Sequence, residues 1–310
     1  RNGYSFKCSN VHQVMTSEGW KKAIDLTDQD RLVIDSNSFF PQDIVRKDGV
    51  RITDTMGWLL GLLVSEGELA SRNTISITNT DKKLIDKVKC VTDYDWKEYE
   101  KEPYTDKRGF DCKRSWTIKF NCTDMRETLY KMGVDYCIHK DKKIPSCILK
   151  SPRSVIVGFL SGLFEGDGTA LQYEGANNGK KKLRVAYYSR SKKLCQQLQI
   201  ILLKFGVYGG LCSRKSELSK HKQWTLQFNG ENALSLYNLL DVEKWNLDNS
   251  NLVFSKKQPN IRKNGDRLVV STWNDGKSRH IGTFNTEQEC IDAFDKYWAE
   301  TEKSFVVKSV

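Results

Sequence analysis

The chain has 310 residues and is basic, because 50 Lys and Arg stand against 39 Asp and Glu, which gives a net charge of +11 and a pI near 9.1. Such a charge favours a nucleic-acid partner, DNA or RNA, although an acidic protein is not excluded. No apolar run reaches the roughly 18 residues of a membrane span, and no secretory signal opens the sequence. We therefore expect an intracellular protein of about two or three domains, neither secreted nor membrane-bound.

The nine cysteines are dispersed and include no Cys-x-x-Cys pair, and the four histidines are dispersed as well. Zinc fingers and nucleases of the His-Asn-His type need closely spaced ligands, so this pattern excludes both. We interpret the cysteines as reduced intracellular thiols rather than as a disulfide framework.

Residues 1–45 form a first domain in which Ser9-Asn10-Val11-His12 precedes Gly19-Trp20. This segment resembles the block of an intein splicing domain that carries a Thr-x-x-His motif. The match is incomplete, because Gln29 replaces the usual Gly and no His-Asn pair ends the chain. We therefore interpret it as a splicing-incompetent remnant that packs on the rest of the chain or contacts DNA. A small β-rich cap without a binding role is the alternative.

Two apolar stretches, Met56–Glu68 and Ile156–Gly168, repeat one pattern. In each, two glycines four positions apart are followed five positions later by an acid, Glu66 or Asp167. Residues four apart share one helix face, and a face without side chains allows close approach of another helix. The pattern predicts two helices, at about 54–66 and 152–165, that pack side by side with both acids together.

Helix-start signals support these boundaries. Thr53 or Asp54 can cap the first helix, and Ser151 can cap the second with Pro152 at the first helical position.

Two carboxylates at the negative ends of adjacent helices repel each other and oppose both helix dipoles. A divalent cation would offset both effects, and Mg²⁺ in particular takes oxygen ligands while leaving positions for water and substrate phosphates. Such a pair therefore suits hydrolysis of a phosphodiester.

The strings Leu59–Gly67 and Leu160–Gly168 resemble the two motifs of a single-chain LAGLIDADG homing endonuclease of the intein-borne subtype. The resemblance implies that Glu66 and Asp167 bind Mg²⁺, for which Mn²⁺ or Ca²⁺ can substitute in binding. The backbone carbonyls of Gly67 or Ser65 and of Gly166 are further candidate ligands. The first copy departs from the family pattern, with Val64 in place of an acid and Glu66 in place of the usual Asp.

The repeat extends beyond the motifs. A strand followed by an amphipathic helix is expected in Asn73–Val88 and again in Lys182–Val207, and strand Ser115–Asn121 matches Gln223–Asn229. We expect an α+β, pseudo-two-fold fold with two αββαββα-like halves, at about 46–150 and 151–255, whose curved antiparallel sheets form a DNA-binding saddle.

The exposed faces of these sheets carry polar and basic side chains that can reach base edges and phosphates in the major groove, although each could instead be a solvated surface residue. The candidates are Ser76, Thr78, Lys119, Arg184, Ser189, Arg190, Arg214, Lys222 and Thr225.

Two lysines occupy matching places in the repeat, since Lys142 follows Glu66 by 76 positions and Lys244 follows Asp167 by 77. The resemblance implies that Lys142 and Lys244 assist catalysis by stabilising charge on the phosphate or polarising the attacking water. Their neighbours Lys140, Lys143 and Lys256 are alternatives.

Residues 256–310 read as a linker, two or three short strands with a turn at Asn274-Asp275-Gly276, and a helix opened by Asn285 or Thr286. Gly282-Thr283-Phe284 and Ala293-Phe294-Asp295 resemble the APETALA2-type DNA-binding domain, while a protein-binding appendage is the alternative. The candidate DNA contacts are Arg267, Trp273, Lys277, Arg279 and His280.

Together these features predict a monomeric, Mg²⁺-dependent endonuclease that cuts double-stranded DNA at a long asymmetric site, without an obligate protein partner. The resemblance implies short 3′ overhangs. A DNA-binding regulator that has lost catalysis and an RNA maturase are the competing interpretations.

Overall fold

The structure, a computed structural model, describes residues 3–33, 40–41, 52–92, 94–107, 109–174, 181–215, 222–247, 260–274 and 277–303. The chain divides into two compact units, one made of Asn2–Tyr4 and Phe39–Leu252 and the other of Ser5–Ser38 and Val253–Val310 together with Arg1. The domain boundaries predicted at 45/46 and 255/256 lie outside the described residues. None of the described helices combines the length and the apolar character that crossing a membrane requires.

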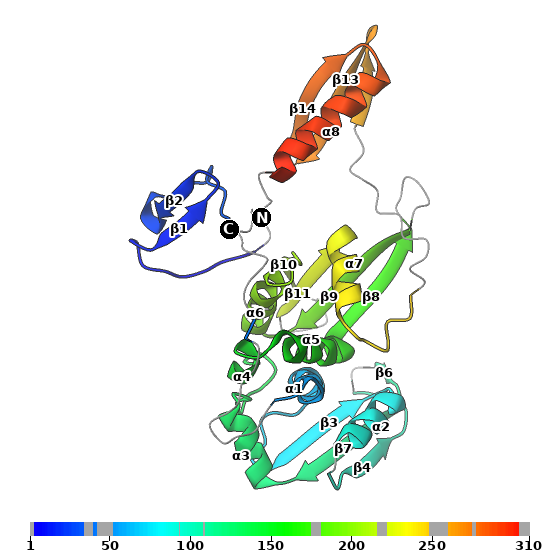
Figure 1. The fold of residues 1–310 in the computed structure, drawn as a ribbon. Coiled ribbons are helices and arrows are strands. Elements are labelled where there is room, and N and C mark those ends of the chain that lie inside the picture. The colour runs from blue at the N-terminus through cyan, green and yellow to red at the C-terminus, as the bar shows by residue number, and fades with distance from the viewer. Residues whose placement is uncertain are drawn as a thin grey trace. The chain divides into compact units, whose positions relative to one another are not determined.

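Helices α1 (Asp54–Glu66) and α5 (Arg153–Asp167) lie side by side at the centre of the larger unit (Figure 1). Their backbones touch where the glycines face each other, because a Cβ on Gly61 would lie 2.0 Å from the Phe159 carbonyl oxygen and one on Gly162 would lie 1.9 Å from that of Trp58. Gly57 and Gly158 are equally confined. The prediction of a side-by-side glycine-faced pair is confirmed.

Of the N-caps predicted for α1 and α5, the first is confirmed and the second is wrong. Thr53 caps α1, since its side chain accepts a hydrogen bond from the Met56 backbone N–H at 3.2 Å. The prediction for Ser151 is wrong, because its hydroxyl donates to the Cys147 carbonyl at 2.8 Å and Pro152 is the N-cap residue of α5. Ser151 lies two residues after the short helix α4 (Ser146–Leu149), and its hydroxyl bonds a carbonyl of that helix instead of capping α5.

The second half of the larger unit has the order αββαββα. After α5 come β8 (Gly168–Glu174), β9 (Lys181–Ser189), α6 (Lys192–Leu203), β10 (Gly210–Lys215), β11 (Lys222–Asn229) and α7 (Gly230–Leu239). The strands form an antiparallel sheet in the order β10-β11-β9-β8.

The first half follows the same plan with one strand fewer. After α1 come β3 (Thr74–Asn79), α2 (Lys82–Val91), β4 (Lys97–Lys101), the short hairpin β5 (Tyr104–Thr105) and β6 (Asp111–Cys112), β7 (Ser115–Asn121) and α3 (Thr123–Lys131). The sheet order is β3-β7-β4, also antiparallel. The α+β class with an antiparallel sheet in each half is therefore confirmed.

The missing strand has a visible cause. Gly67 makes only an isolated bridge to Ile77, where the second half pairs Gly168 with Tyr187 in a full strand. Beyond Gly67, backbone carbonyls of the chain instead accept hydrogen bonds from Arg126, which is only 1 % exposed. The Arg126 guanidinium donates to the carbonyls of Leu69, Ser71, Val134 and Asp135 at 2.9 to 3.1 Å. A buried side chain thus satisfies backbone groups that a strand partner would otherwise take.

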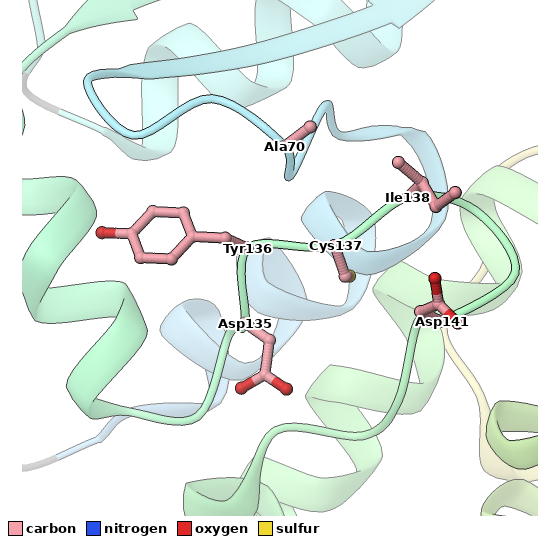
Figure 2. Close-up of a pocket in the computed structure, with 6 residues that line it drawn as sticks. All are labelled: Ala70, Asp135, Tyr136, Cys137, Ile138 and Asp141. Atoms are coloured by element: carbon pink, nitrogen blue, oxygen red, sulfur yellow. The ribbon is translucent and has the colours of Figure 1, made fainter.

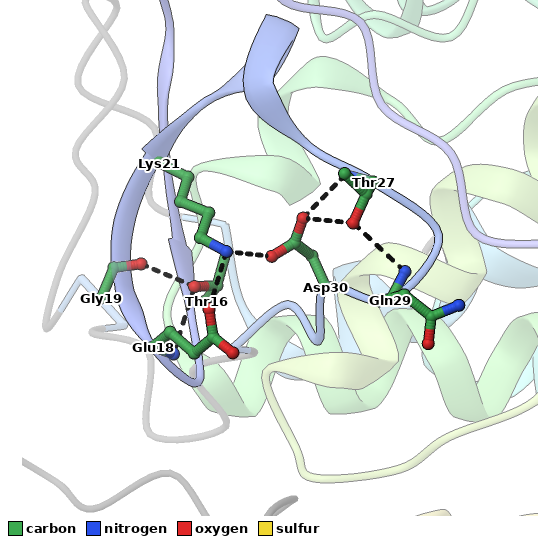
Figure 3. A network of polar contacts seen from close by, with 7 residues as sticks. All are labelled: Thr16, Glu18, Gly19, Lys21, Thr27, Gln29 and Asp30. Carbon is green, nitrogen blue, oxygen red and sulfur yellow. Dashed lines mark hydrogen bonds and ion pairs between the residues drawn. The ribbon is translucent and has the colours of Figure 1, made fainter.

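In the smaller unit, the N-terminal segment forms a hairpin of β1 (Gln13–Thr16) and β2 (Gly19–Lys22) followed by a short turn of helix, η1 (Ala23–Asp25). Lys21 bonds Asp30 at 2.5 Å and Glu18 at 2.8 Å, and Asp30 accepts from the Thr27 backbone N–H at 2.7 Å (Figure 3). The bond from Lys21 holds the pKa of Asp30 at about 2. These contacts close the loop after η1 onto the hairpin.

The C-terminal part has three antiparallel strands, β12 (Asn260–Asn264), β13 (Arg267–Asn274) and β14 (Lys277–Phe284), and one helix, α8 (Glu287–Lys303). The helix packs on the sheet through Val270, Cys290 and Phe294. Of the two predicted start residues, Thr286 caps the helix, since its hydroxyl accepts the Glu289 backbone N–H at 3.2 Å. The Glu289 carboxylate in turn accepts the backbone N–H groups of Asn285 and Thr286 at 3.0 and 3.1 Å, which completes a capping box. The predicted turn lies partly, and the linker wholly, outside the described residues.

Replacing Gly162 with Ala should lower the free energy of unfolding by about 3 kcal/mol, because the new methyl group would overlap backbone of α1 and force the helices apart. Gly210→Ala is the control, since a Cβ there meets nothing within 4 Å, and it should change stability by less than about 0.5 kcal/mol. Urea unfolding measures both, and equal effects would contradict the close helix contact.

Candidate active site

The paired helices end in two half-buried carboxylates, Glu66 on α1 and Asp167 on α5. The two helix ends are in contact, since a Cβ on Gly166 would lie 2.2 Å from Ser65 Oγ and 2.9 Å from Glu66 Cγ. Burial raises the pKa of Asp167 to about 6. Burial, and after it the charge of Asp167, raise the pKa of Glu66 to about 7, so this carboxyl holds a proton about half of the time at neutral pH.

Two lysines reach the same place from different segments. Lys142, which is 5 % exposed, donates from Nζ to the Ser65 carbonyl at 2.7 Å, and Lys244 donates from Nζ to the Gly166 carbonyl at 2.6 Å. Each lysine therefore binds the carbonyl immediately before the acid of its own half. Burial lowers the pKa of Lys142, while the charges of Asp167 and Glu66 oppose that change.

The alternative lysines lie elsewhere. Lys143 pairs with Asp135 at 2.6 Å, Lys140 is exposed, and Lys256 lies outside the described residues. The structure thus brings together Glu66, Asp167, Lys142 and Lys244.

The sequence did not predict two further residues at this site, Asn79 and Tyr187. Asn79, the last residue of β3, hydrogen-bonds Glu66 and accepts the Asp81 backbone N–H at 2.8 Å, so its amide group donates to the carboxylate. Tyr187 on β9 is fully buried, and its hydroxyl has no hydrogen-bond partner among the described residues. Burial and the nearby charges of Asp167 and Glu66 raise the pKa of Tyr187.

The only sequence signal for these residues was their place in the repeat. Asn79 corresponds to Ser189, which likewise accepts a backbone N–H two positions on, from Ser191 at 3.1 Å. Tyr187 corresponds to Ile77, because each pairs with the glycine that follows the acid of its half. The two halves therefore place different groups beside their acids.

The loop that leads to Lys142 borders a pocket of about 460 Å³ (Figure 2), lined by Ala70, Asp135, Tyr136, Cys137, Ile138 and Asp141. Asp135 is already paired with Lys143, and burial raises the pKa of the Cys137 thiol, which keeps it protonated. No cluster of three or more His, Cys, Asp or Glu suited to a metal exists in the part of the chain that the structure describes. The lining of this pocket therefore offers no metal site.

The sheet faces turned away from the helices carry most of the candidate DNA contacts. Strand register places Thr78 and Lys119 on this face in the first half, and Arg184, Arg214 and Thr225 in the second, while Arg190 is exposed just beyond β9. The Arg184 guanidinium lies 4.8 Å from the Tyr173 ring centre. These faces are polar and positively charged.

Three of the nine sheet candidates are placed differently from the prediction. Ser76 and Ser189 are buried, 5 % and 9 % exposed, and Ser189 shares the inward register of Val185 and Tyr187. Lys222 is exposed, but it has the inward register of Trp224 and lies 4.6 Å from its ring centre, so it lies on the other face of the sheet. The exposed position predicted for Ser76 and Ser189 is wrong, because alternation along a single strand does not reveal which face is covered.

In the C-terminal part, Arg279 and His280 are exposed, and Arg267 bonds the Asn285 side chain at 3.3 Å. The side chains of Trp273 and Lys277 lie outside the described residues, although their backbones belong to β13 and β14.

Comparison with known families matches residues 154–240, essentially the second half, to the LAGLIDADG-like domain. Three curated proteins are also similar to parts of the chain. The chain is 24 % identical to the DNA-directed RNA polymerase subunit Rpo1C of Methanocaldococcus jannaschii over 52 % of its own length and 17 % of the relative's. It is 23 % identical to the replicative DNA helicase DnaB of Synechocystis over 76 % and 27 %, and 38 % identical to the DNA polymerase II large subunit of Thermococcus kodakarensis over 22 % and 3 %.

The chain therefore spans less than a third of the length of the curated relatives it matches. Among solved structures it is similar to the homing endonuclease I-WcaI bound to its DNA recognition sequence, with a TM-score of 0.45 and 14 % identity over 72 % of this chain and 100 % of that one. It is also similar to the LAGLIDADG homing endonuclease I-GzeII in complex with its DNA target, with a TM-score of 0.36 and 11 % identity over 60 % and 84 %.

The raised pKa of Glu66 predicts a pH-dependent stability. The folded protein holds this proton more tightly than the unfolded chain, so the contribution of Glu66 to stability falls as the pH rises from 4.5 to about 7. Without metal, Glu66→Gln should be more stable than the wild type by about 2 kcal/mol above pH 7, and the difference should vanish below the ordinary carboxyl pKa.

Thermal unfolding at several pH values measures this difference. The exposed neighbour offers a control, since Glu68→Gln should change stability by less than about 0.5 kcal/mol. A Glu66→Gln profile parallel to the wild type would contradict the raised pKa.

Proposed function

We propose that this protein is a site-specific endonuclease that hydrolyses one phosphodiester bond in each strand of double-stranded DNA. The observation that carries the proposal is the pairing of Glu66 and Asp167 at the ends of the two glycine-faced helices, each with a lysine bonded beside it. The LAGLIDADG-like domain in residues 154–240 supports it.

The donor set suits a hard divalent cation. The site offers carboxylate and carbonyl oxygens, from Glu66, Asp167, Ser65 and Gly166, and no imidazole or thiolate is needed. The carbonyls of Ser65 and Gly166 accept from lysines but retain a second lone pair. When bound, Mg²⁺ would supply positive charge that stabilises the phosphate under attack, and Mn²⁺ or Ca²⁺ can substitute in binding.

The protein side chains supply the remaining chemistry. Lys142 and Lys244 hold their ammonium groups beside the two acids, where they can bind the non-bridging oxygens of the target phosphates. Asn79 orients Glu66 by donating to its carboxylate. Glu66 can take up a proton near pH 7, since its pKa is about 7 before any cation binds.

Recognition of the target belongs to the two sheet faces. Thr78, Lys119, Arg184, Arg214 and Thr225 present donors to bases and phosphates, and the net charge of +11 favours binding to the backbone. Because the halves differ in sequence, the target is long and asymmetric. The C-terminal sheet extends the contacts, and bending of central base pairs adds readout without direct contact.

The chain matches only small parts of large proteins of different kinds, and one explanation accounts for all of these matches. A replicative helicase, part of an RNA polymerase and part of a DNA polymerase share with this chain only a segment of 3 to 27 % of their length. A self-contained element carried within unrelated host proteins accounts for that distribution. This supports an intein-type mobile element as the origin of the chain, with residues 1–45 as the splicing remnant.

A DNA-binding protein that no longer cuts is the second candidate. The first helix has Val64 where the second has the acid Glu165, and it has Glu66 where the second has Asp167. Both candidates bind DNA, and only the endonuclease breaks it.

Incubation of the protein with a randomised duplex library and Mg²⁺ should yield cut ends at one sequence, with short 3′ overhangs. Asp167→Asn and Glu66→Gln should bind that sequence as the wild type does and cut it at least about 100-fold more slowly. Gel shift measures binding, and end-labelled strands measure cutting. Asp167→Asn that cuts at the wild-type rate would refute the mechanism, and wild-type protein that binds one sequence without cutting is the regulator.

The adjacent lysines provide a matched pair. Lys142→Met should slow cutting about 100-fold because it removes the ammonium group beside Glu66, whereas Lys143→Met breaks only a surface ion pair and should change the rate by less than about twofold. Equal rates for these two variants would exclude Lys142 from the reaction.

A further inference from the structure

Glu165 is a buried acid, 4 % exposed, in the last turn of α5, and the reaction proposed above does not use it. Its carboxylate accepts the backbone N–H of Glu243 at 2.9 Å and that of Lys244 at 3.4 Å. Ser161, one turn earlier on the same helix, accepts the backbone N–H of Asp241 at 3.0 Å. Helix α5 therefore holds the segment that carries Lys244 at three backbone amides.

The first half has no such anchor on its helix. The positions of α1 that correspond to Ser161 and Glu165 are Leu60 and Val64, and neither side chain can accept a hydrogen bond. Lys142 is instead held from the second half, because Ser191 donates to the Lys142 carbonyl at 2.6 Å and Gln197 accepts the Ile144 backbone N–H at 2.9 Å.

The two lysines also differ in their surroundings. Lys142 is buried, so packing restricts its side chain, whereas Lys244 is exposed and has less to hold it. Fixing the backbone of residues 241–244 is therefore what keeps the Lys244 ammonium group within 2.6 Å of the Gly166 carbonyl, beside Asp167.

We propose that Glu165 is a positioning residue that fixes Lys244 and thereby acts on only one of the two strand cleavages. The proposal rests on the endonuclease function. It implies that the halves depend on separate anchors: loss of the Glu165 anchor slows the strand that needs Lys244, and loss of the Gln197 anchor slows the strand that needs Lys142.

The test measures the cutting rate of each strand separately on a supercoiled plasmid that carries the target. Lys244→Met and Lys142→Met first identify which strand depends on which lysine. Glu165→Gln should then slow the Lys244 strand about tenfold, leave the other within twofold, and accumulate nicked circles. Gln197→Met should show the opposite strand bias, and both variants should bind the target as the wild type does.

Ser161→Ala is the milder second variant, since it removes one anchoring bond and keeps the buried carboxylate. It should show the same strand bias as Glu165→Gln with a smaller effect, so the test does not depend on one buried substitution folding. Equal slowing of both strands by Glu165→Gln and Ser161→Ala, or no slowing, would overturn the positioning role while leaving the endonuclease function intact.

A measurement without DNA separates the two proposals. In protein whose lysines carry ¹³C-methyl groups, Glu165→Gln should move the NMR signal of Lys244 toward that of a free lysine side chain and leave the signal of Lys142 in place. If the wild type never cuts, the endonuclease function fails, and this spectrum alone decides the positioning role. An unchanged Lys244 signal would overturn it.

Discussion

The backbone contact between α1 and α5 is the constraint on which the rest of the molecule depends. Helices whose glycine faces touch must end close together, so the contact decides that Glu66 and Asp167 share one small volume. It also fixes where the lysines must arrive and how far apart the two sheets stand. A protein interior transmits such a constraint because it is close-packed, and here the packing unit is the helix backbone itself. The same four glycines, Gly57, Gly61, Gly158 and Gly162, therefore determine both the helix packing and the position of the two acids.

The contact has an electrostatic cost. The two acids keep raised pKa values although Lys142 and Lys244 lie beside them, so the lysines only partly offset the cost of burying the carboxylates and, at Glu66, the repulsion from Asp167. Stability and chemistry conflict here, as they commonly do at functional sites. The protein confines the conflict to the helix ends. The remainder of the helix pair is apolar and well packed, with Leu60, Leu163 and Phe164 almost fully buried.

The sequence was informative where a signal was local or repeated. Glycine spacing, the register of the acids and the matching places of Lys142 and Lys244 all appear in two copies, and the structure brings those groups together. The sequence did not predict side chains that bind backbone far away along the chain. Arg126 binds carbonyls from separate loops, and Glu165 binds backbone amides that follow it by more than 70 positions. Ser151 had two compatible uses, and only the preceding helix decides between them. Burial of Ser76 and Ser189 depends on neighbouring segments that strand alternation does not report.

The anchors of Lys142 make the two halves unequal as evolutionary and engineering units. A lysine that belongs to the first half by chain order is located by Ser191 and Gln197, at the start of α6 and within it, in the second. The second half also possesses its full four-stranded sheet, while the first ends its sheet early in favour of Arg126. Recombination between relatives at the junction before α5 would therefore inherit a complete second half but would separate Lys142 from its supports, unless the α6 residues travel with it. Chimeric proteins need that short patch of α6 to be matched to the incoming first half.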